Sequence, residues 1–253
     1  MQVTFEHPLN ERVRTFLRLE HLFDKVAHFM PQEDPWAMRV VVESLLDIVS
    51  ITSRADIRGE LLKELDRNAA TLAQYARQPG VDPKALSQVQ ADLAKAQSRL
   101  LHLNRPIGQT AREDEFLKSV AQRNVIPGGT CSFDLPSFHF WLMLPPERRD
   151  ERFSRWMQDL DPVNEAIVLA LMLARGSART RRLVAEAGFF QEALDIQAPA
   201  QLVRVSLNGG QSLFPEISGH KSRFSIRFMS PEANGRAAQS RDDVDFVLAC
   251  CAF

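Results

Sequence analysis

The chain has 253 residues, of which 45% are hydrophobic, and its 31 Lys and Arg residues nearly balance its 32 Asp and Glu residues. This length allows a sizeable core, while the net charge of −1 excludes a protein that binds polyanions over its whole surface. No apolar stretch reaches the roughly 18 residues that a transmembrane helix needs, and the N-terminal residues lack a signal-peptide core, so we expect a cytoplasmic protein without membrane insertion.

Residues 1–180 are predicted to form a helical domain, because apolar residues recur every three or four positions and the breaks fall on Pro, Gly and Asn. A first helix is expected from Glu11 to about Phe29 and a second from Trp36 to about Ile51. In each of them one apolar stripe faces a polar side, which is typical of helices packed around a common core.

A helical hairpin is predicted next, over residues 56–103. Asp56 is a candidate N-cap for its first arm, the turn "QPGVDP" separates the arms, and Asp82 with Pro83 begins the second. The apolar positions of both arms have heptad-like spacing. This spacing fits packing within the chain, and it equally fits a scaffold that pairs with another coiled coil.

Three further helical segments follow in the sequence. A short helix is expected from Thr110 to Gln122. Asp134 before Leu135 and Pro136 favours a helix start over a strand in the aromatic segment that follows. Residues 162–175 are apolar on nearly every side, which predicts the buried centre of the helical bundle.

Beyond about Ser177 the sequence changes to short alternating runs of β-branched and aromatic residues, so residues 181–253 are predicted to form a smaller β domain. Two or three strands are expected around the Asn-Gly-Gly turn at 208–210, and one more near 244–250. Residues 2–6 are a candidate strand of the same sheet. The predicted fold class is therefore α+β, with an antiparallel helical domain and a mainly antiparallel β domain.

One stretch of the β domain, "SGHKSRFSIRF" at 218–228, concentrates positive charge. Side chains of a strand alternate between its two faces, so the apolar residues here are predicted to face the core and the bases to face outward. Lys221, Arg223 and Arg227 would then form a row about 13 Å long, suited to an acidic peptide or to spaced phosphates.

Two other interpretations of these bases stay open. Asp243 and Asp245 alternate on the last predicted strand and would neutralise the row as cross-strand ion pairs. Alternatively, the row binds nucleic acid or an anionic surface, together with a second group of bases at Arg175, Arg179, Arg181 and Arg182. That second group lacks interleaved aromatic residues, which favours a solvated linker.

Several strings along the chain are highly specific. "FEHPLNERVRTFLRLE" (5–20), "ELLKELDR" (60–67), "IPGGTCSFDLPSFHFWL" (126–142), "PEISGHKSRFSIRFM" (215–229) and "LACC" (248–251) resemble, in this order, the ZapD family of bacterial cell-division proteins. The resemblance implies a symmetric homodimer with a helical and a β domain. It also implies binding to the C-terminal tail of FtsZ, bundling of FtsZ filaments and localisation at the midcell division ring.

The resemblance further implies a basic pocket for the FtsZ tail at the junction of the two domains. Carried over residue by residue, this pocket contains Arg54, Arg112, His220, Lys221, Arg223 and Arg227. This chain departs from the family in one respect, because Glu115 stands where the family pattern has a further base. No nucleic acid is expected as a partner.

Catalysis is not expected from the sequence. Cys131 with His139 is the best candidate for a nucleophile and a base, but no local signature surrounds either residue. Cys250 and Cys251 are vicinal and are predicted to point to opposite faces of a strand. No zinc-ligand spacing or phosphate-binding loop occurs, so we expect no metal and no cofactor.

Overall fold

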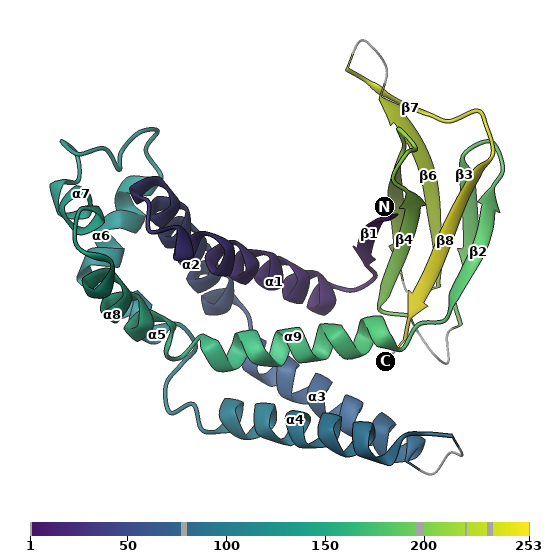
Figure 1. Cartoon of the computed structure of the whole chain (residues 1–253), viewed down its shortest axis with the longest axis horizontal. Coiled ribbons are helices and arrows are strands. Elements are labelled where there is room, and N and C mark those ends of the chain that lie inside the picture. Colours follow the sequence, from purple (N-terminus) through teal and green to yellow (C-terminus); the bar gives the residue numbers. More distant parts are fainter. Residues whose placement is uncertain (1, 77–79, 196–199, 221, 232–234, 253) are drawn as a thin grey trace. The chain divides into compact units, whose positions relative to one another are not determined.

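The computed structural model describes residues 2–76, 80–195, 200–220, 222–231 and 235–252. Its helices precede most of its strands, which confirms the α+β class (Figure 1). The chain divides into two compact units, one made of Arg18–Ala170 and the other of Met1–Leu17 with Leu171–Phe253. The domain limits 1–180 and 181–253 stay a prediction, because a compact unit reports packing and not independent folding.

The first of these units, called here the helical unit, contains most of the helical residues. The helices and one 3-10 turn of the described chain are α1 (Glu11–Phe29), η1 (Met30–Gln32), α2 (Pro35–Arg54), α3 (Ile57–Tyr75), α4 (Pro83–Leu101), α5 (Gln109–Glu113), α6 (Glu115–Asn124), α7 (Pro136–Leu142), α8 (Pro146–Met157) and α9 (Asp161–Gly176). The predicted first and second helices and both arms of the hairpin are thereby confirmed.

Aspartates begin four of these helices, α2, α3, α4 and α6, by capping free backbone N–H groups. Asp34 accepts hydrogen bonds from the backbone N–H groups of Trp36 and Ala37, Asp56 from Gly59 and Asp82 from Lys84. An N-cap of this kind stabilises a helix by about 1 kcal/mol. The caps predicted at Asp56 and Asp82 are thus confirmed.

The helical region differs from the prediction in three places. The helix expected over 110–122 is two helices, because Asp114 ends α5, caps the backbone N–H of Leu117 in α6 and pairs with Arg152. Helix α8 was not predicted. The buried centre expected at 162–175 is wrong on one side, where Val168 and Met172 of α9 are about half exposed.

The second compact unit, called here the β unit, contains all the described strands. These are β1 (Gln2–Pro8), β2 (Thr180–Ala185), β3 (Phe189–Ala193), β4 (Leu202–Asn208), β5 (Phe214–His220), β6 (Arg223–Pro231), β7 (Ala237–Gln239) and β8 (Val244–Cys251). The strand predicted at residues 2–6 exists as β1 and pairs antiparallel with β4 (Figure 1).

The strands form two antiparallel sheets. Sheet A has the order β1-β4-β8-β2, and sheet B has the order β3-β6-β5 with β7 also paired to β6. Strands β4 and β5 flank the Asn-Gly-Gly segment and lie in different sheets, so this turn crosses between sheets and closes no hairpin. The prediction of a single sheet around this turn is therefore wrong. Strands β2 and β3, which the sequence analysis did not predict, complete the two sheets.

The inner faces of the two sheets share one hydrophobic core. Phe246 of sheet A packs against Phe190 and Phe228 of sheet B, with ring centroids 5.3 and 5.0 Å apart. Phe224 and Ile226 are buried in the same cluster. Because this core fixes the inner side chains of β6, the side chains between them are held on the outer face of sheet B.

Candidate functional site

The bases of β6 lie on the outer face of sheet B, as predicted. Phe224, Ile226 and Phe228 are buried, while Arg223 and Arg227 are exposed and lie four residues apart on the other face. Their Cα atoms are therefore about 13 Å apart along the strand. We call Arg223 and Arg227 the basic row. Because β6 is paired on both sides, the row is mounted on a rigid strand.

The neighbouring strands add polar and aromatic side chains to this face. On β5, His220 lies opposite Arg223 and Glu216 lies opposite Arg227. On β3, Phe189 lies opposite Arg227 and is 39% exposed. The face thus combines bases with an accessible aromatic ring, which suits a peptide that carries both acidic and apolar side chains.

No carboxylate of the described residues forms an ion pair with Arg223 or Arg227, and this includes Glu216 across the strand. The ion-pair interpretation with Asp243 and Asp245 is wrong, because β8 pairs with β2 and β4 in sheet A. The Asp243 carboxylate accepts a hydrogen bond from the Ala187 backbone N–H at 2.9 Å. The bases of the row are therefore available to a ligand.

A small pocket of about 230 Å³ lies beside the row and is lined by Gln191, Ser218, Gly219, His220, Arg223, Phe224 and Ser225. Each polar side chain that lines this pocket has an N–H or O–H group that can donate a hydrogen bond. Gly219 allows the strand to approach its neighbours closely, because a Cβ there would come within 2.8 Å of both Leu9 and Phe224. No carboxylate is among the described residues that line this pocket, so it fits a carboxylate or phosphate oxygen of a ligand.

Three other predicted site residues are not among the described residues of the β unit. Lys221 falls outside the described residues. Arg54 and Arg112 belong to the helical unit, where Arg54 is the exposed last residue of α2 and Arg112 lies in α5. The structure thus brings His220, Arg223 and Arg227 together. A shared pocket with Arg54 and Arg112 at a domain junction stays a prediction.

Arg112 lines a second pocket, which lies entirely within the helical unit and has a volume of about 410 Å³. Two more arginines that the sequence did not single out, Arg58 and Arg105, line it as well. Arg58 opens α3 and Arg105 follows α4. Arg58 and Arg105 lie close together because α4 runs back along α3. The predicted hairpin was therefore the one feature of the sequence that indicated their proximity.

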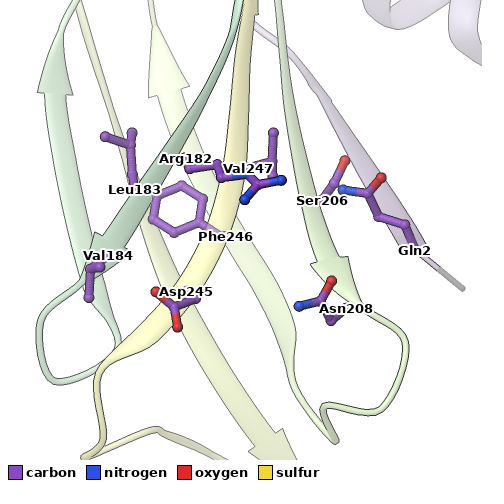
Figure 2. A pocket seen from close by; sticks show the side chains of 9 residues that line it. All are labelled: Gln2, Arg182, Leu183, Val184, Ser206, Asn208, Asp245, Phe246 and Val247. Atoms are coloured by element: carbon purple, nitrogen blue, oxygen red, sulfur yellow. The ribbon is translucent and has the colours of Figure 1, made fainter.

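In the second group of bases, Arg175 to Arg182, carboxylates of the chain engage two of the four arginines. Arg175 donates two hydrogen bonds to the Glu6 carboxylate, at 2.9 and 2.7 Å, and Arg181 pairs with Glu192 at 2.7 Å. The linker interpretation is also wrong, because Arg181 and Arg182 lie within β2. Arg182 points into a polar pocket of about 680 Å³ on sheet A that also contains Asp245, as Figure 2 shows.

The cysteines show no catalytic arrangement within the described chain. The Cys131 thiol lies 3.6 Å from the Asp134 carboxylate, and no hydrogen bond between Cys131 and His139 is present there. Cys251 is fully buried and Cys250 is half-buried, as their alternation predicts. Burial raises the pKa of Cys251 to about 11, which leaves it as an uncharged thiol at neutral pH.

Two other kinds of site were sought in the described part of the chain. No cluster of three or more His, Cys, Asp or Glu side chains is arranged there to hold a metal ion. None of the described helices is both long and apolar enough to cross a membrane. Arg223 and Arg227, which have no carboxylate partner among the described residues, therefore call for a functional explanation.

Taken together, the described chain is an α+β protein with positively charged side chains exposed on one face of sheet B. The family model of ZapD, described as a cell division protein, matches residues 17–227. A "Cell division protein ZapD" of Methylococcus capsulatus is 44% identical over 250 residues, which cover 99% of this chain and 98% of that protein. Another from Enterobacter sp. (strain 638) is 40% identical over 249 residues, covering 98% of each. The chain belongs to the ZapD family of cell division proteins.

Proposed function

We propose that this chain binds the C-terminal tail of FtsZ through the basic row and cross-links FtsZ filaments into bundles at the midcell division ring. The observation that supports this most directly is that Arg223 and Arg227 lie about 13 Å apart on one face of a rigid strand, without a carboxylate partner among the described residues. Bound carboxylates of a peptide would supply the missing acceptors. Each such charge-assisted hydrogen bond contributes about 1.5–3 kcal/mol.

The face also offers a place for the apolar part of a peptide. Phe189 lies next to Arg227 and is accessible, so an extended segment that places a carboxylate on Arg223 can lay an apolar side chain on this ring. Alternate side chains of an extended peptide point the same way and repeat about every 6.6 Å. Two such repeats match the separation of the two arginines.

Bundling needs two tail sites in one assembly. A symmetric homodimer would carry two copies of the row, and each filament displays many tails. Once one tail is bound, the second site meets the others at high effective concentration, so weak single sites suffice. In this proposal the protein acts by binding alone, with no catalytic step and no cofactor.

The experiment is fluorescence anisotropy of a labelled FtsZ C-terminal tail peptide titrated with the wild-type chain and with the Arg223→Glu/Arg227→Glu double variant. Loss of two charge-assisted contacts should weaken binding by about 3 kcal/mol, or roughly a hundredfold in Kd. Arg241→Glu, an exposed charge reversal outside the strands of the same unit, is the matched control and should bind like wild type.

Circular dichroism and size-exclusion chromatography show whether each variant is folded and has the wild-type oligomeric state. Equal tail binding by wild type and a folded double variant would show that the basic row is not part of the tail-binding site. The proposed function is wrong if the folded wild type does not bind the tail but binds a single-stranded oligonucleotide with steep salt dependence. The row would then bind nucleic acid.

A further inference from the structure

Polar side chains occupy the middle of the outer face of sheet B, between the two arginines of the basic row. Ser225 of β6 lies midway between Arg223 and Arg227, and the strand register places Gln191 of β3 and Ser218 of β5 directly opposite it. Same-face neighbours on a strand are about 6.6 Å apart. Donors from three adjacent strands therefore surround Ser225 on this face.

The pocket of about 230 Å³ beside the row covers this position. Its lining contains Ser218, Ser225, Gln191, His220 and Arg223. Sites for drug-sized ligands usually have volumes above about 300 Å³, so this pocket suits a single functional group of a ligand.

The neutral donors of the pocket are not used within the described part of the chain. The side chains of Ser218, Ser225 and Gln191 form no hydrogen bond with a described residue. His220 accepts at Nδ1 from the backbone N–H of Ser222, 3.4 Å away, so the proton of its neutral ring lies on Nε2. These four side chains are thus available to donate hydrogen bonds to one ligand.

The donors of this pocket favour a phosphate group with three free oxygens. A carboxylate offers two oxygens in one plane, whereas a phosphate monoester offers three and carries a charge of about −1.5 to −2 at pH 7. A phosphodiester of nucleic acid carries a single charge. Because the donors come from three strands and include Arg223, the anion with more oxygens and more charge gains more from them.

The acidic side chain closest to this position on the same face does not enter the pocket. Glu216 lies opposite Arg227 and is not among the described residues that line it. A dianion bound above Ser225 therefore meets donors and a guanidinium group, without a carboxylate in the described lining to repel it.

We infer that the outer face of sheet B contains a binding site, centred on Ser225, for inorganic phosphate or a small phosphate monoester. Arg223 neutralises the charge, while the neutral donors of the pocket bind the oxygens. Because Arg223 also belongs to the basic row, bound phosphate competes with the FtsZ tail, a consequence that rests on the proposed function. Small phosphate-bearing molecules would thereby weaken filament bundling.

The first test uses no FtsZ sequence. The amide resonances of Ser218 and Ser225 in the ¹⁵N-labelled full chain are followed by NMR during titration with inorganic phosphate, glycerol 3-phosphate, dimethyl phosphate or acetate at matched ionic strength. Saturable shifts are expected with the first two, and binding at least about tenfold weaker with the diester and with acetate. The tighter of the first two identifies the source of the phosphate group. Equal responses to phosphate and acetate, or no response to either phosphate, overturn the inference.

Matched variants locate the site. Gln191→Glu introduces a carboxylate into the pocket without a change of shape, and Gln2→Glu makes the same change on sheet A. Gln191→Glu should abolish saturable phosphate binding, and Gln2→Glu should change the Kd less than about twofold. Ser225→Ala should weaken binding about tenfold, with Ser230→Ala on the same strand as its control. Unchanged phosphate binding by folded Gln191→Glu would show that this pocket is not the site.

A second test asks whether phosphate competes with the FtsZ tail. The anisotropy titration with the labelled tail is repeated with inorganic phosphate at about ten times its own Kd, and with chloride at the same ionic strength. Competition should raise the apparent Kd of the tail about tenfold. An unchanged Kd, with phosphate binding intact, contradicts the competition alone. Absence of tail binding by wild type contradicts the proposed function, while the NMR titration still decides the phosphate site.

Discussion

The outer faces of the two sheets use arginine in opposite ways. On sheet A, the Glu6 carboxylate of β1 accepts a hydrogen bond from Arg204 of β4 at 2.8 Å and two from Arg175 at the end of α9. On sheet B, Arg223 and Arg227 have no carboxylate partner among the described residues. The arginines on both faces belong to regular elements, so secondary structure alone would not separate their roles.

The contrast shows that an arginine's partner, more than its position, indicates its role. Burial alone would raise the pKa of Glu6, but the hydrogen bonds and charges of Arg175 and Arg204 outweigh it and hold the pKa below its ordinary value of 4.5. Those two arginines therefore stabilise the fold. The unpaired arginines of sheet B contribute little to stability and remain free to bind a partner.

The strongest test of this contrast is to neutralise one residue on each face. Glu6→Gln leaves two arginines without their shared carboxylate, so we expect a loss of about 2 kcal/mol in the free energy of unfolding, while Arg223→Gln should change it by less than about 0.5 kcal/mol. Urea unfolding followed by circular dichroism measures both. Equal destabilisation by the two substitutions would contradict the conclusion that arginines stabilise the fold on sheet A and not on sheet B.

The pH dependence of unfolding sharpens the same point. Because the folded-state pKa of Glu6 is lowered, its stabilising contribution is fully present above its ordinary value of 4.5 and is lost as the pH falls through the folded-state value. The difference in unfolding free energy between wild type and Glu6→Gln should therefore shrink as the pH drops below 4.5. A difference that stays constant down to pH values near 3 would show that the Glu6 pKa is not lowered.

The smallest expected effect concerns the single carboxylate opposite the row. Glu216 lies across from Arg227 without pairing to it, and it would repel an acidic peptide. Glu216→Gln should strengthen binding of the FtsZ tail about two- to threefold at low salt, and less at physiological salt because the charges are screened. Asp245→Asn on sheet A is the control and should leave the Kd unchanged. Weaker binding by Glu216→Gln would mean that Glu216 contacts a base of the ligand.

The sequence was sufficient for features that depend on neighbouring residues. The alternation of Phe224, Ile226 and Phe228 with the arginines predicted both faces of β6, because the side-chain period of a strand is a local property. The partners of the strand were not predictable in the same way. Asp243 has the right spacing to pair with the row, yet strand pairing between distant segments placed it beside β2.

Helix α8 illustrates a second limit. Its sequence, "PERRDERFSRWM", begins with the second of two consecutive prolines and is so charged that its apolar stripe is short. The helix is held by contacts that the sequence does not display, such as Arg152 over the ring of Phe116 at 4.4 Å and the buried Trp156. The pocket of Arg58, Arg105 and Arg112 escaped prediction for the same reason, since it depends on side chains from separate segments.

The pairing of β1 with β4 also bears on how the β unit is made. Thr4 and Ser206 share a hydrogen bond although 202 positions separate them, and β8 must then fit between β4 and β2. During translation, β1 is therefore synthesised before its partner strand β4 and stays unpaired while the helical segments are translated. Contacts of such long range form slowly, so we expect the helical unit to fold first. The core behind the basic row would close only after the segment from residue 244 onward has been released.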